Sequence, residues 1–374
     1  MSDLFILAAE PSADLHGAHL IDALHSLAPH QSIAGVLGPR MREKNVQCCY
    51  QMEELQVMGF TDVIAALPRL FRLFRQIRQT ILELNPRTVV CIDYPGFNIR
   101  LEQSLRKKGY RGRLIHYICP TVWAWGKKRI PVMAKNLDLL LTLFPFEKDC
   151  FAYTSLPVQY VGHPLVKKTD QHLPNAHFHE RYHLNPTKKI LALFPGSRQT
   201  EIERNFPLQI AAAKEMLAKT PDQQIAVSLS HPQFRAHLAR CGFPIIEPEH
   251  NYDLMRHAHL ALATSGTVTL ELALFQTPTV AQFAIRPFDV FLAQKIFRIN
   301  LPHYVIVNIL MRKTVFPELF GPHLTLESLL HSAKILWNDE HARQICKEGC
   351  HQMKELLGNT DASHEAARAI LYRS

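Results

Sequence analysis

Short apolar runs alternate with longer amphipathic stretches along the first part of the chain, and this alternation limits the folds it can adopt. The runs are apolar at nearly every position, which is typical of parallel strands that are covered on both faces. The stretches between them, such as 18–27 and 98–108, carry apolar residues at helical spacing. The predicted strands are residues 4–9, 33–37, 89–92, 114–118, 137–144 and 158–161. The pattern predicts an α/β domain built on a doubly wound parallel sheet.

A second segment with the same alternation follows a break at 162–189, where prolines and many polar residues are typical of a linker. Because 374 residues exceed the size at which one hydrophobic core usually stops growing, two domains are expected. Further strands are predicted at 190–194, 224–229, 260–263 and 279–283, and helices over 326–371. We therefore predict an N-terminal domain over 1–165, a linker over 166–188, a second domain over 189–345 and C-terminal helices over 346–374.

The composition indicates a folded protein of the cytoplasm. An apolar fraction of 47% with 20% charged residues is ordinary for globular chains and too apolar for disorder. No apolar run approaches the roughly 20 residues that a membrane span needs. The opening run 4–9 is too short for a signal peptide and has no basic flank. The eight cysteines form no C-x-x-C pair, and several lie in apolar runs, as reduced core thiols do.

The formal charge of +9 indicates an acidic partner, which can be nucleic acid, an anionic membrane or a phosphorylated small molecule. Nucleic-acid-binding proteins tend to carry dense basic runs or basic-aromatic motifs. The longest basic clusters here, 106–108 and 127–129, are short. A membrane or a phosphate is therefore favoured, and no nucleic-acid partner is expected.

Acidic residues follow two of the predicted strands of the first domain, where open α/β sheets bind ligands. The loop after the first strand brings Glu10, Asp14 and His16 to the start of a helix. Taken alone, this loop is better explained by Ser12 capping the helix and Asp14 complementing its dipole. Asp93 ends another strand and precedes a Pro-Gly pair, so it is either a ligand-facing carboxylate or a turn residue. The two interpretations of Asp93 are equally supported.

Two loops of the second domain are suited to phosphate. In the loop 194–201, a Pro-Gly turn is followed by Ser197, by Arg198, which can contact two phosphate oxygens, and by Glu201. In the loop 263–271, a Ser-Gly-Thr turn opens a helix and presents backbone N–H groups to an anion. The residues of that turn are Ser265, Gly266 and Thr267. Glu271, one turn later, is placed to accept hydrogen bonds from a ribose diol. Because both loops, 194–201 and 263–271, are suited to phosphate, a phosphate site is favoured over two ordinary capped helices.

Several nucleotide and metal motifs are missing from the sequence. It contains neither a G-x-x-x-x-G-K-[ST] loop nor a G-x-G-x-x-G fingerprint. No loop carries a D-x-D motif, which disfavours a transferase that uses a metal-bound diphosphate. The histidines at 177, 179 and 183 lie in the predicted linker without a nearby cysteine, so a solvated surface is favoured over a zinc site. No metal and no cofactor are predicted.

The segment 67–84 combines a continuous apolar face with regularly spaced arginines. Read as a helix, its apolar face consists of Leu70, Phe71, Phe74, Ile77, Ile81 and Leu84, and the flanking arginines are Arg69, Arg72, Arg75 and Arg78. One interpretation is a core helix with a basic outer face. The other is an amphipathic helix that meets anionic lipid and acyl chains. The segment alone supports both equally.

Taken together, the motifs resemble those of the lipid-A-disaccharide synthase family, in the same order and over most of the chain. They lie at 8–18, 57–59, 92–101, 120–125 with 127–129, 144–147, 161–164, 195–198 with Glu201, and 265–271. The sequence departs from the family pattern in two places. Ala9 and Ala13 replace two glycines of the first loop, and Gly96 stands where many members carry a second acid.

The resemblance implies a GT-B fold, with two Rossmann-like domains facing a cleft and a C-terminal helix able to cross back to the first. It also implies a reaction of lipopolysaccharide assembly in Gram-negative bacteria. UDP-2,3-diacylglucosamine and 2,3-diacylglucosamine 1-phosphate give a β-1,6-linked disaccharide 1-phosphate and UDP. The family works as a peripheral protein on the inner face of the inner membrane, so the anionic membrane surface would be a further partner. The sequence leaves open whether the protein forms a homodimer.

This chemistry needs a base for the acceptor hydroxyl and positive charge for the departing diphosphate. Asp93 is the first candidate for the base, followed by Glu10 and Asp14. Lys127 or Arg129 is expected to hold the acceptor phosphate, and Arg69, Arg72, Phe71 and Phe74 to meet the membrane. Two alternatives are a UDP-sugar epimerase with the same two-domain fold and, less supported, a basic RNA-binding protein.

Overall fold

The computed structural model describes residues 2–55, 60–124, 126–219, 222–286 and 301–372. The chain divides into two compact units. The N-terminal unit comprises Met1–Pro164 together with Asn359–Ser374, and the C-terminal unit comprises Leu165–Gly358. The motif at 57–59 and residue 125 of the tryptophan motif lie outside the described residues.

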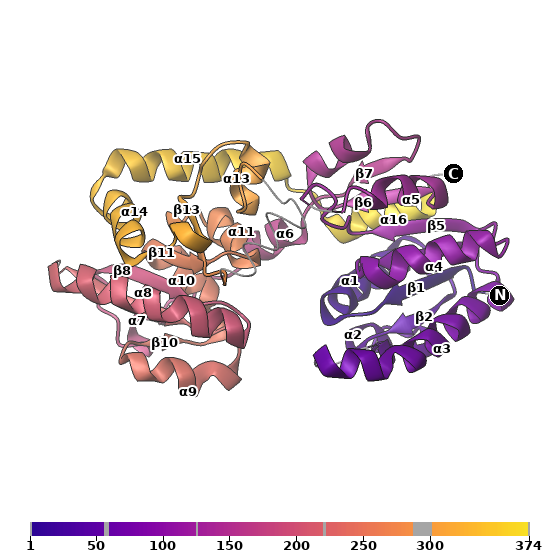
Figure 1. Ribbon diagram of the computed structural model, residues 1–374, viewed down its shortest axis with the longest axis horizontal. Coiled ribbons are helices and arrows are strands. Elements are labelled where there is room, and N and C mark those ends of the chain that lie inside the picture. The colour runs from indigo at the N-terminus through magenta and orange to yellow at the C-terminus, as the bar shows by residue number, and fades with distance from the viewer. Residues whose placement is uncertain (1, 56–59, 125, 220–221, 287–300, 373–374) are drawn as a thin grey trace. The chain divides into compact units, whose positions relative to one another are not determined.

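The N-terminal unit is built on a seven-stranded parallel sheet in the order β3-β2-β1-β4-β5-β6-β7 (Figure 1). The strands are β1 (Leu4–Ala8), β2 (Ile33–Leu37), β3 (Gln47–Gln51), β4 (Thr88–Ile92), β5 (Arg113–Tyr117), β6 (Leu139–Thr142) and β7 (Val158–Tyr160). Every residue of β1, β2 and β4 is buried, as their continuous apolar runs predict. The six predicted strands are confirmed, whereas the polar edge strand β3 carries no such run and was not predicted.

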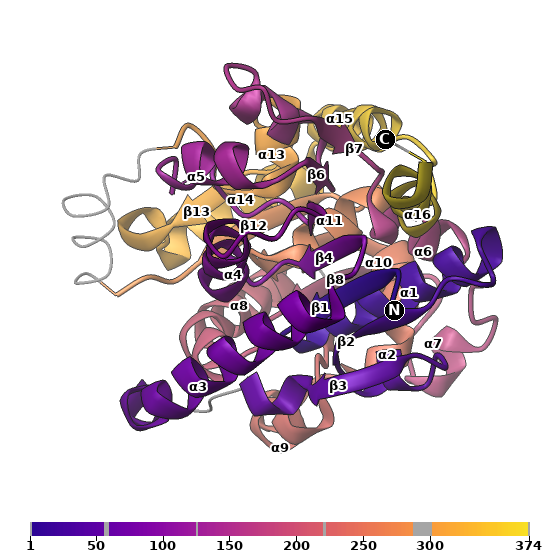
Figure 2. The ribbon, with the colours of Figure 1, turned by 90° about the vertical axis from the view of Figure 1, so that its right-hand side faces the viewer.

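Helices cover both faces of this sheet. Its helices are α1 (Pro11–Leu27), α2 (Pro39–Arg42), α3 (Phe60–Leu84), α4 (Pro95–Lys107), α5 (Arg129–Asn136) and α16 (Ala362–Tyr372), with 3₁₀ turns at Met52–Leu55 and Pro145–Phe151. Alternate strand residues point to opposite faces, so Ile6 packs with α1 and α16 while Phe5 and Leu7 pack with α3, α4 and α5. Figures 1 and 2 show α1 and α16 side by side.

The C-terminal end of the chain completes the N-terminal unit. The Arg113 guanidinium on β5 donates a hydrogen bond of 2.7 Å to the Ile370 carbonyl of α16. The preceding helix α15 (Glu340–Leu357) belongs to the C-terminal unit. The segment 346–374, which we predicted as one group of helices, is therefore shared between the two units, and the C-terminal helix returns to the first of them.

The C-terminal unit is built on a six-stranded parallel sheet in the order β10-β9-β8-β11-β12-β13. The strands are β8 (Lys189–Phe194), β9 (Gln223–Ser228), β10 (Ile245–Ile246), β11 (Ala258–Thr264), β12 (Thr279–Phe283) and β13 (Glu318–Phe320). The helices are α6 (Pro164–Asp170), α7 (Phe178–Arg181), α8 (Gln199–Lys219), α9 (Arg235–Leu238), α10 (Asn251–His257), α11 (Thr267–Leu274), α13 (Ile306–Met311), α14 (Leu326–Asn338) and α15. The predicted fold class, two parallel α/β domains, is confirmed.

The stretch predicted as a linker, 166–188, is folded within the C-terminal unit. It forms α6 and α7, and the side chains of Phe178 and Leu184 are buried in the core beside β8. Its prolines and polar residues therefore mark turns between short helices.

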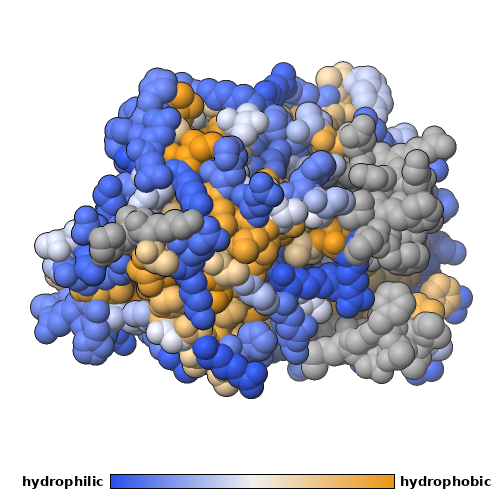
Figure 3. Space-filling model, turned by 60° about the vertical axis from the view of Figure 1, so that its left-hand side comes forward, coloured by the Kyte–Doolittle hydropathy of each residue, from blue (hydrophilic) through white to orange (hydrophobic). Residues whose placement is uncertain are grey.

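The surface is mostly hydrophilic on the face shown in Figure 3, with apolar side chains gathered between the polar ones. Large apolar side chains are exposed on both units, among them Phe71, Tyr153, Leu173 and Ile345. Within the described part of the chain, no helix combines the length and the apolar character needed to span a membrane.

Candidate functional site

In each sheet the strand order changes direction at one central pair of neighbouring strands. In the N-terminal unit this point lies between β1 and β4, which are followed by α1 on one face and α4 on the other. In the C-terminal unit it lies between β8 and β11, which are followed by α8 and α11. Ligands of open α/β sheets bind at the carboxyl ends of the strands at such points.

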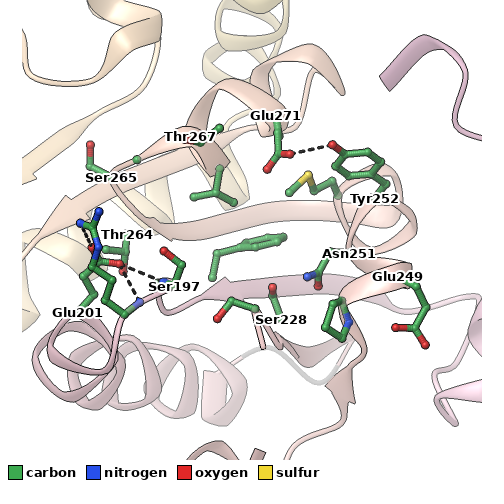
Figure 4. A pocket seen from close by; sticks show the side chains of 18 of the residues that line it. Ser197, Glu201, Ser228, Glu249, Asn251, Tyr252, Thr264, Ser265, Thr267 and Glu271 are labelled. Atoms are coloured by element: carbon green, nitrogen blue, oxygen red, sulfur yellow. Dashed lines mark hydrogen bonds and ion pairs between the residues drawn. The ribbon is translucent and has the colours of Figure 1, made fainter. Parts of the chain in front are cut away.

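A cavity of about 700 Å³ lies at this point of the C-terminal unit. It is lined by all seven residues that the sequence predicted for the donor, namely Ser197, Arg198, Glu201, Ser265, Gly266, Thr267 and Glu271. Figure 4 shows Glu271 and Tyr252 on one side of the cavity and Ser197 and Glu201 on another. The two predicted loops therefore meet at a single site.

The first loop is shaped by Glu201, on the first turn of α8. Its carboxylate accepts hydrogen bonds from the backbone N–H groups of Ser197 (3.0 Å) and Arg198 (3.3 Å). Gly196 has a φ of +122°, and a Cβ there would lie 2.8 Å from the Glu201 Cβ, so glycine is needed. Glu201 also pairs with the Arg198 guanidinium at 3.1 Å, which stays largely exposed to the cavity. Glu201 therefore holds the loop in shape, and the exposed Arg198 guanidinium is placed to contact an anion in the cavity.

The second loop is tied to the first and leads into α11. The Thr264 hydroxyl donates a hydrogen bond of 2.8 Å to the Pro195 carbonyl. Among the described residues, no side chain caps the N-terminus of α11 at Gly266, and no atom lies within 4 Å of the position that a Cβ on Gly266 would take. Helix N-termini carry partial positive charge, so the first turn of α11 presents open N–H groups to an anion in the cavity.

Glu271 is a partly buried carboxylate held by a residue that the sequence did not single out. The Tyr252 hydroxyl donates a hydrogen bond of 2.7 Å to Glu271 Oε1. Burial raises the pKa of Glu271, while this hydrogen bond and the nearby Lys168 ammonium act in the opposite direction. Lys168 lies 5.1 Å from the Tyr252 ring centre. Neither residue lies in a recognisable motif, because Lys168 comes from the predicted linker and Tyr252 from a short helix.

The far end of the cavity also went unpredicted. Five residues form it: Ser228 ends β9, Ser230 follows that strand, Pro248 lies in the 3₁₀ turn before α10, and Asn251 and Met255 belong to α10. Asn251 donates a hydrogen bond of 2.9 Å to the Leu229 carbonyl, so its amide is held in place. Mixed apolar and polar linings of this kind are typical of small-molecule sites.

Two carboxyl groups meet at the corresponding point of the N-terminal unit. Glu10 follows β1 and Asp93 follows β4, and their side chains lie within hydrogen-bonding reach of one another. Burial and the neighbouring Glu10 carboxylate together raise the pKa of Asp93 to about 6. Asp93 and Tyr94 both have left-handed backbone, with φ of +47° and +46°. Non-glycine residues rarely adopt this conformation, and such strain clusters at functional sites.

The family model described as lipid-A-disaccharide synthetase matches residues 4–371. The chain belongs to this family. Lipid-A-disaccharide synthase of Rhodospirillum centenum is 36% identical over 98% of this chain and 94% of its own length. The enzyme of Chlamydia trachomatis serovar D is 37% identical over 99% of this chain, which spans 62% of the length of that relative. The family predicted from the motifs is confirmed.

Solved structures with the same fold are much more distant in sequence. The UDP-GlcNAc 2-epimerase of Methanocaldococcus jannaschii, in complex with UDP-GlcNAc and UDP, is 14% identical with a TM-score of 0.59, over the whole of both chains. The glycotransferase of kitacinnamycin is 13% identical with a TM-score of 0.63, over 99% of this chain and 98% of that one. These likenesses establish the shared fold alone.

In this member of the lipid-A-disaccharide synthetase family, Asp14 has a structural role. Its buried carboxylate accepts hydrogen bonds of 3.0 Å from the backbone N–H groups of both Arg40 and Met41, at the start of α2. A Cβ at Gly38 would lie only 2.3 Å from the Asp14 Cγ, so the fit is close. Because both carboxylate oxygens are occupied, we no longer count Asp14 among the candidate bases. Nothing in the sequence marked the short helix α2 that it caps.

Aromatic side chains gather near the carboxyl ends of the last strands of the N-terminal unit. The Trp123 ring lies 5.6 Å from Phe146, and Phe144 lies 5.9 Å from Phe146 and 5.0 Å from His163. Glu147, in the same motif, is buried and accepts the Phe144 N–H. Burial raises the pKa of Glu147 to about 8. Lys127, which is exposed, and the half-buried Arg129 lie just before and at the start of α5, after this tryptophan motif.

Helix α3 divides its apolar residues between core and surface. Leu73, Ile77 and Ile81 are buried, and Phe74 packs edge-to-face on Phe97 at 5.3 Å. Phe71, from the predicted apolar face, is 57% exposed under the Arg75 guanidinium, so it does not pack in the core. Arg69, Arg72 and Arg75 are exposed, whereas Arg78 donates to the Ser104 hydroxyl at 3.0 Å. The helix is therefore both a core element and a basic surface that carries exposed aromatic and aliphatic side chains.

Proposed function

We propose that the protein is a lipid-A-disaccharide synthase, which moves 2,3-diacylglucosamine from its UDP carrier to the 6-hydroxyl of 2,3-diacylglucosamine 1-phosphate. Membership of the family and the names of relatives at 36–37% identity support this reaction. The structural observation that carries it is the cavity of the C-terminal unit, because one site combines an exposed arginine, an open helix N-terminus and a partly buried carboxylate. The arginine and the helix N-terminus suit a diphosphate, and the carboxylate suits a ribose diol.

In this proposal the donor is held by the two loops of the C-terminal unit. Arg198 and the first turn of α11, with Ser265, Gly266 and Thr267, bind the diphosphate. The Glu271 carboxylate, positioned by Tyr252, accepts hydrogen bonds from the ribose hydroxyls. The far end of the cavity, with the held amide of Asn251, receives the base. Uracil is the base implied by the family.

The chemical step inverts the configuration at the anomeric carbon of the donor. The acceptor hydroxyl oxygen forms a bond to that carbon while the bond to the diphosphate oxygen breaks, and the electron pair leaves with UDP. Asp93 takes the proton from the hydroxyl, because its pKa of about 6 leaves it mostly ionised but still basic at neutral pH. Arg198 and the α11 N-terminus stabilise the negative charge that develops on UDP, so the step needs no metal ion.

The acceptor and its acyl chains involve the N-terminal unit. Lys127 and Arg129 are proposed to bind the acceptor 1-phosphate. The exposed side chains Leu67 and Phe71, together with the arginines of α3, are proposed to lie against the anionic inner face of the inner membrane. Such contacts would place a peripheral enzyme where its acylated substrates reside.

An assay of substrate dependence separates this function from that of an epimerase, whose solved examples share the fold. The purified protein is incubated with UDP-2,3-diacylglucosamine alone and with both substrates. We expect UDP release only when the acceptor is present. Conversion of the donor sugar to an epimer without the acceptor would contradict the proposal.

A further inference from the structure

Three stacked aromatic rings lie in a row that begins at the donor cavity, and the site described so far does not use them. Phe283, the last residue of β12, lines the cavity. Its ring centre is 6.2 Å from that of Phe320, the last residue of β13, and the two planes are inclined by 23°. Phe320 stacks in turn on Tyr304, with centres 5.1 Å apart and an inclination of 26°. We call these three side chains the aromatic shelf.

The sheet of the C-terminal unit holds the first two rings in place. Strands β12 and β13 are parallel neighbours, and Phe283 is paired with Phe320 in their register. Side chains at paired positions stand on the same face of a sheet, one strand spacing apart. Both residues also lie at the carboxyl ends of their strands, the edge at which open α/β sheets bind ligands. The position of the two rings beside the cavity therefore follows from the backbone.

Glu318, the first residue of β13, fixes the third ring. Its carboxylate accepts hydrogen bonds from the backbone N–H groups of Tyr304 (3.0 Å) and Val305 (2.9 Å). It also lies 3.0 Å from His303 Nδ1. The backbone that carries Tyr304 is therefore tied to the same strand as Phe320, so the row of rings is held at both of its ends.

The aromatic shelf is accessible from the outside. Phe283 and Phe320 are partly exposed, and Tyr304 is 42% exposed. Apolar surface in contact with water is unfavourable, and exposed apolar side chains that gather at a ligand cavity are typical of binding surfaces. The shelf thus extends the donor cavity by an apolar surface that reaches solvent.

The inner end of the shelf lies beside the loop assigned to the diphosphate. The Ser265 N–H donates a hydrogen bond of 2.8 Å to the carbonyl of Gln282, the residue directly before Phe283. In the proposed function Ser265 is one of the residues that bind the diphosphate, and the acylated sugar is bonded to that diphosphate. An acyl chain on the sugar would therefore leave the cavity next to Phe283.

We propose that the aromatic shelf binds an acyl chain of the donor, which lies along Phe283, Phe320 and Tyr304 as it leaves the cavity. Flat aromatic rings offer a large apolar contact area, which suits a flexible hydrocarbon chain. The inference rests on the proposed function, because that function supplies the acylated donor. The three residues determine specificity for the chain and take no part in proton transfer.

Donor binding without the acceptor tests the shelf. The affinities for UDP and for UDP-2,3-diacylglucosamine with short or long acyl chains are measured by titration calorimetry in detergent, with vesicles absent so that membrane contacts do not contribute. The wild type should bind the long-chain donor more tightly than the short-chain donor. Tyr304→Ala and Phe320→Ala should each reduce this preference roughly tenfold, the effect of losing contact with about two methylene groups. UDP, which has no acyl chain, should bind all three proteins equally well.

Tyr153→Ala is the matched control, because it removes a ring that is 72% exposed on the N-terminal unit and should leave the chain-length preference unchanged. Should Phe320→Ala not fold, the exposed Tyr304 carries the same prediction. A wild-type preference in the folded shelf variants, or an equal loss of affinity for short and long chains, overturns the inference even if the disaccharide is formed. If the preference falls as expected but the wild type forms no disaccharide, the proposed reaction fails and the shelf stands. A wild type that binds neither UDP nor the donor contradicts both.

Discussion

Asp93 illustrates how one residue acquires its chemistry from its surroundings. It ends a buried strand with strained backbone, beside the carboxylate of Glu10. The sequence could predict its position at the end of β4, because the apolar run stops there. It could not predict the pairing with Glu10, which follows from β1 and β4 being neighbours in the sheet. The role of Asp14 was equally hidden, since it depends on a four-residue helix without a sequence signal.

We expect Asp93→Asn to lower turnover by roughly 10²- to 10⁴-fold, because the general base is lost. In the wild type, turnover should fall as the pH drops through about 6, since Asp93 is then protonated. Both statements are checked by measuring UDP release: the rate of Asp93→Asn is compared with that of the wild type, and kcat/KM of the wild type is measured as a function of pH. A folded Asp93→Asn protein that keeps near-wild-type turnover would exclude Asp93 as the base.

At the donor site, Arg198→Ala should cripple turnover without unfolding the protein. Charge-assisted hydrogen bonds to a desolvated diphosphate are worth on the order of 1.5–3 kcal/mol, or roughly 10- to 150-fold in rate. Because the Arg198 guanidinium is mostly exposed, its ion pair with Glu201 contributes little to stability and the melting temperature should change little. Steady-state kinetics with Gln199→Ala, the exposed neighbour on α8, as a control would test this. Equal rates for both variants would remove Arg198 from the mechanism.

At the scale of secondary-structure elements, α3 combines exposed arginines with the exposed apolar side chains of Leu67 and Phe71. Replacing Arg69, Arg72 and Arg75 with Gln should weaken binding to anionic vesicles, because each basic side chain near the surface contributes roughly 1 kcal/mol. The remaining binding should depend less on salt. Vesicle sedimentation at several salt concentrations measures this.

The control for α3 removes three exposed basic residues from the C-terminal unit instead, as Lys189→Gln, Arg256→Gln and Lys347→Gln. Both triple variants have the same net charge, so a non-specific charge effect predicts equal losses. Equal vesicle binding in the two variants would show that α3 is an ordinary surface helix. Phe71→Ser should further reduce the use of long-chain substrates, since its exposed ring is placed to meet acyl chains.

Elements with strong patterns were predictable from the sequence, and those with mixed patterns were not. Continuous apolar runs gave β1, β4 and β8 because strands covered on both faces have no polar side. The short helices α6 and α7 were taken for a linker, because four to seven residues hold too few positions to display a helical period. On α3, apolar residues occur on two faces, so spacing alone could not separate the buried Leu73 from the exposed Phe71.

For the whole molecule, both domains and the donor loops followed from the sequence, whereas the complete donor site did not. The two loops share a sheet edge, so their meeting was predictable. Tyr252 and Lys168 reach the cavity from α10 and α6, and only the tertiary fold brings these elements to Glu271. Contacts between residues that are far apart in the sequence, such as Lys168 and Tyr252, cannot be recognised from local sequence spacing.

The reaction should not depend on a divalent metal. In the proposed mechanism, the charge on the leaving diphosphate is met by Arg198 and the N-terminus of α11. Turnover in excess EDTA should therefore equal turnover in its absence. The assay is repeated with added magnesium, and a rate that EDTA abolishes and magnesium restores would require a metal at the phosphate site.

The reaction product tests the account most directly. The purified protein is incubated with UDP-2,3-diacylglucosamine and 2,3-diacylglucosamine 1-phosphate, and the products are analysed by mass spectrometry and NMR. We predict one UDP for each disaccharide 1-phosphate formed, with a β-1,6 linkage between the sugars, and almost no product from Asp93→Asn. Absence of the disaccharide with intact, folded wild-type protein, or an α-linked product, would contradict the proposed function and its inverting mechanism.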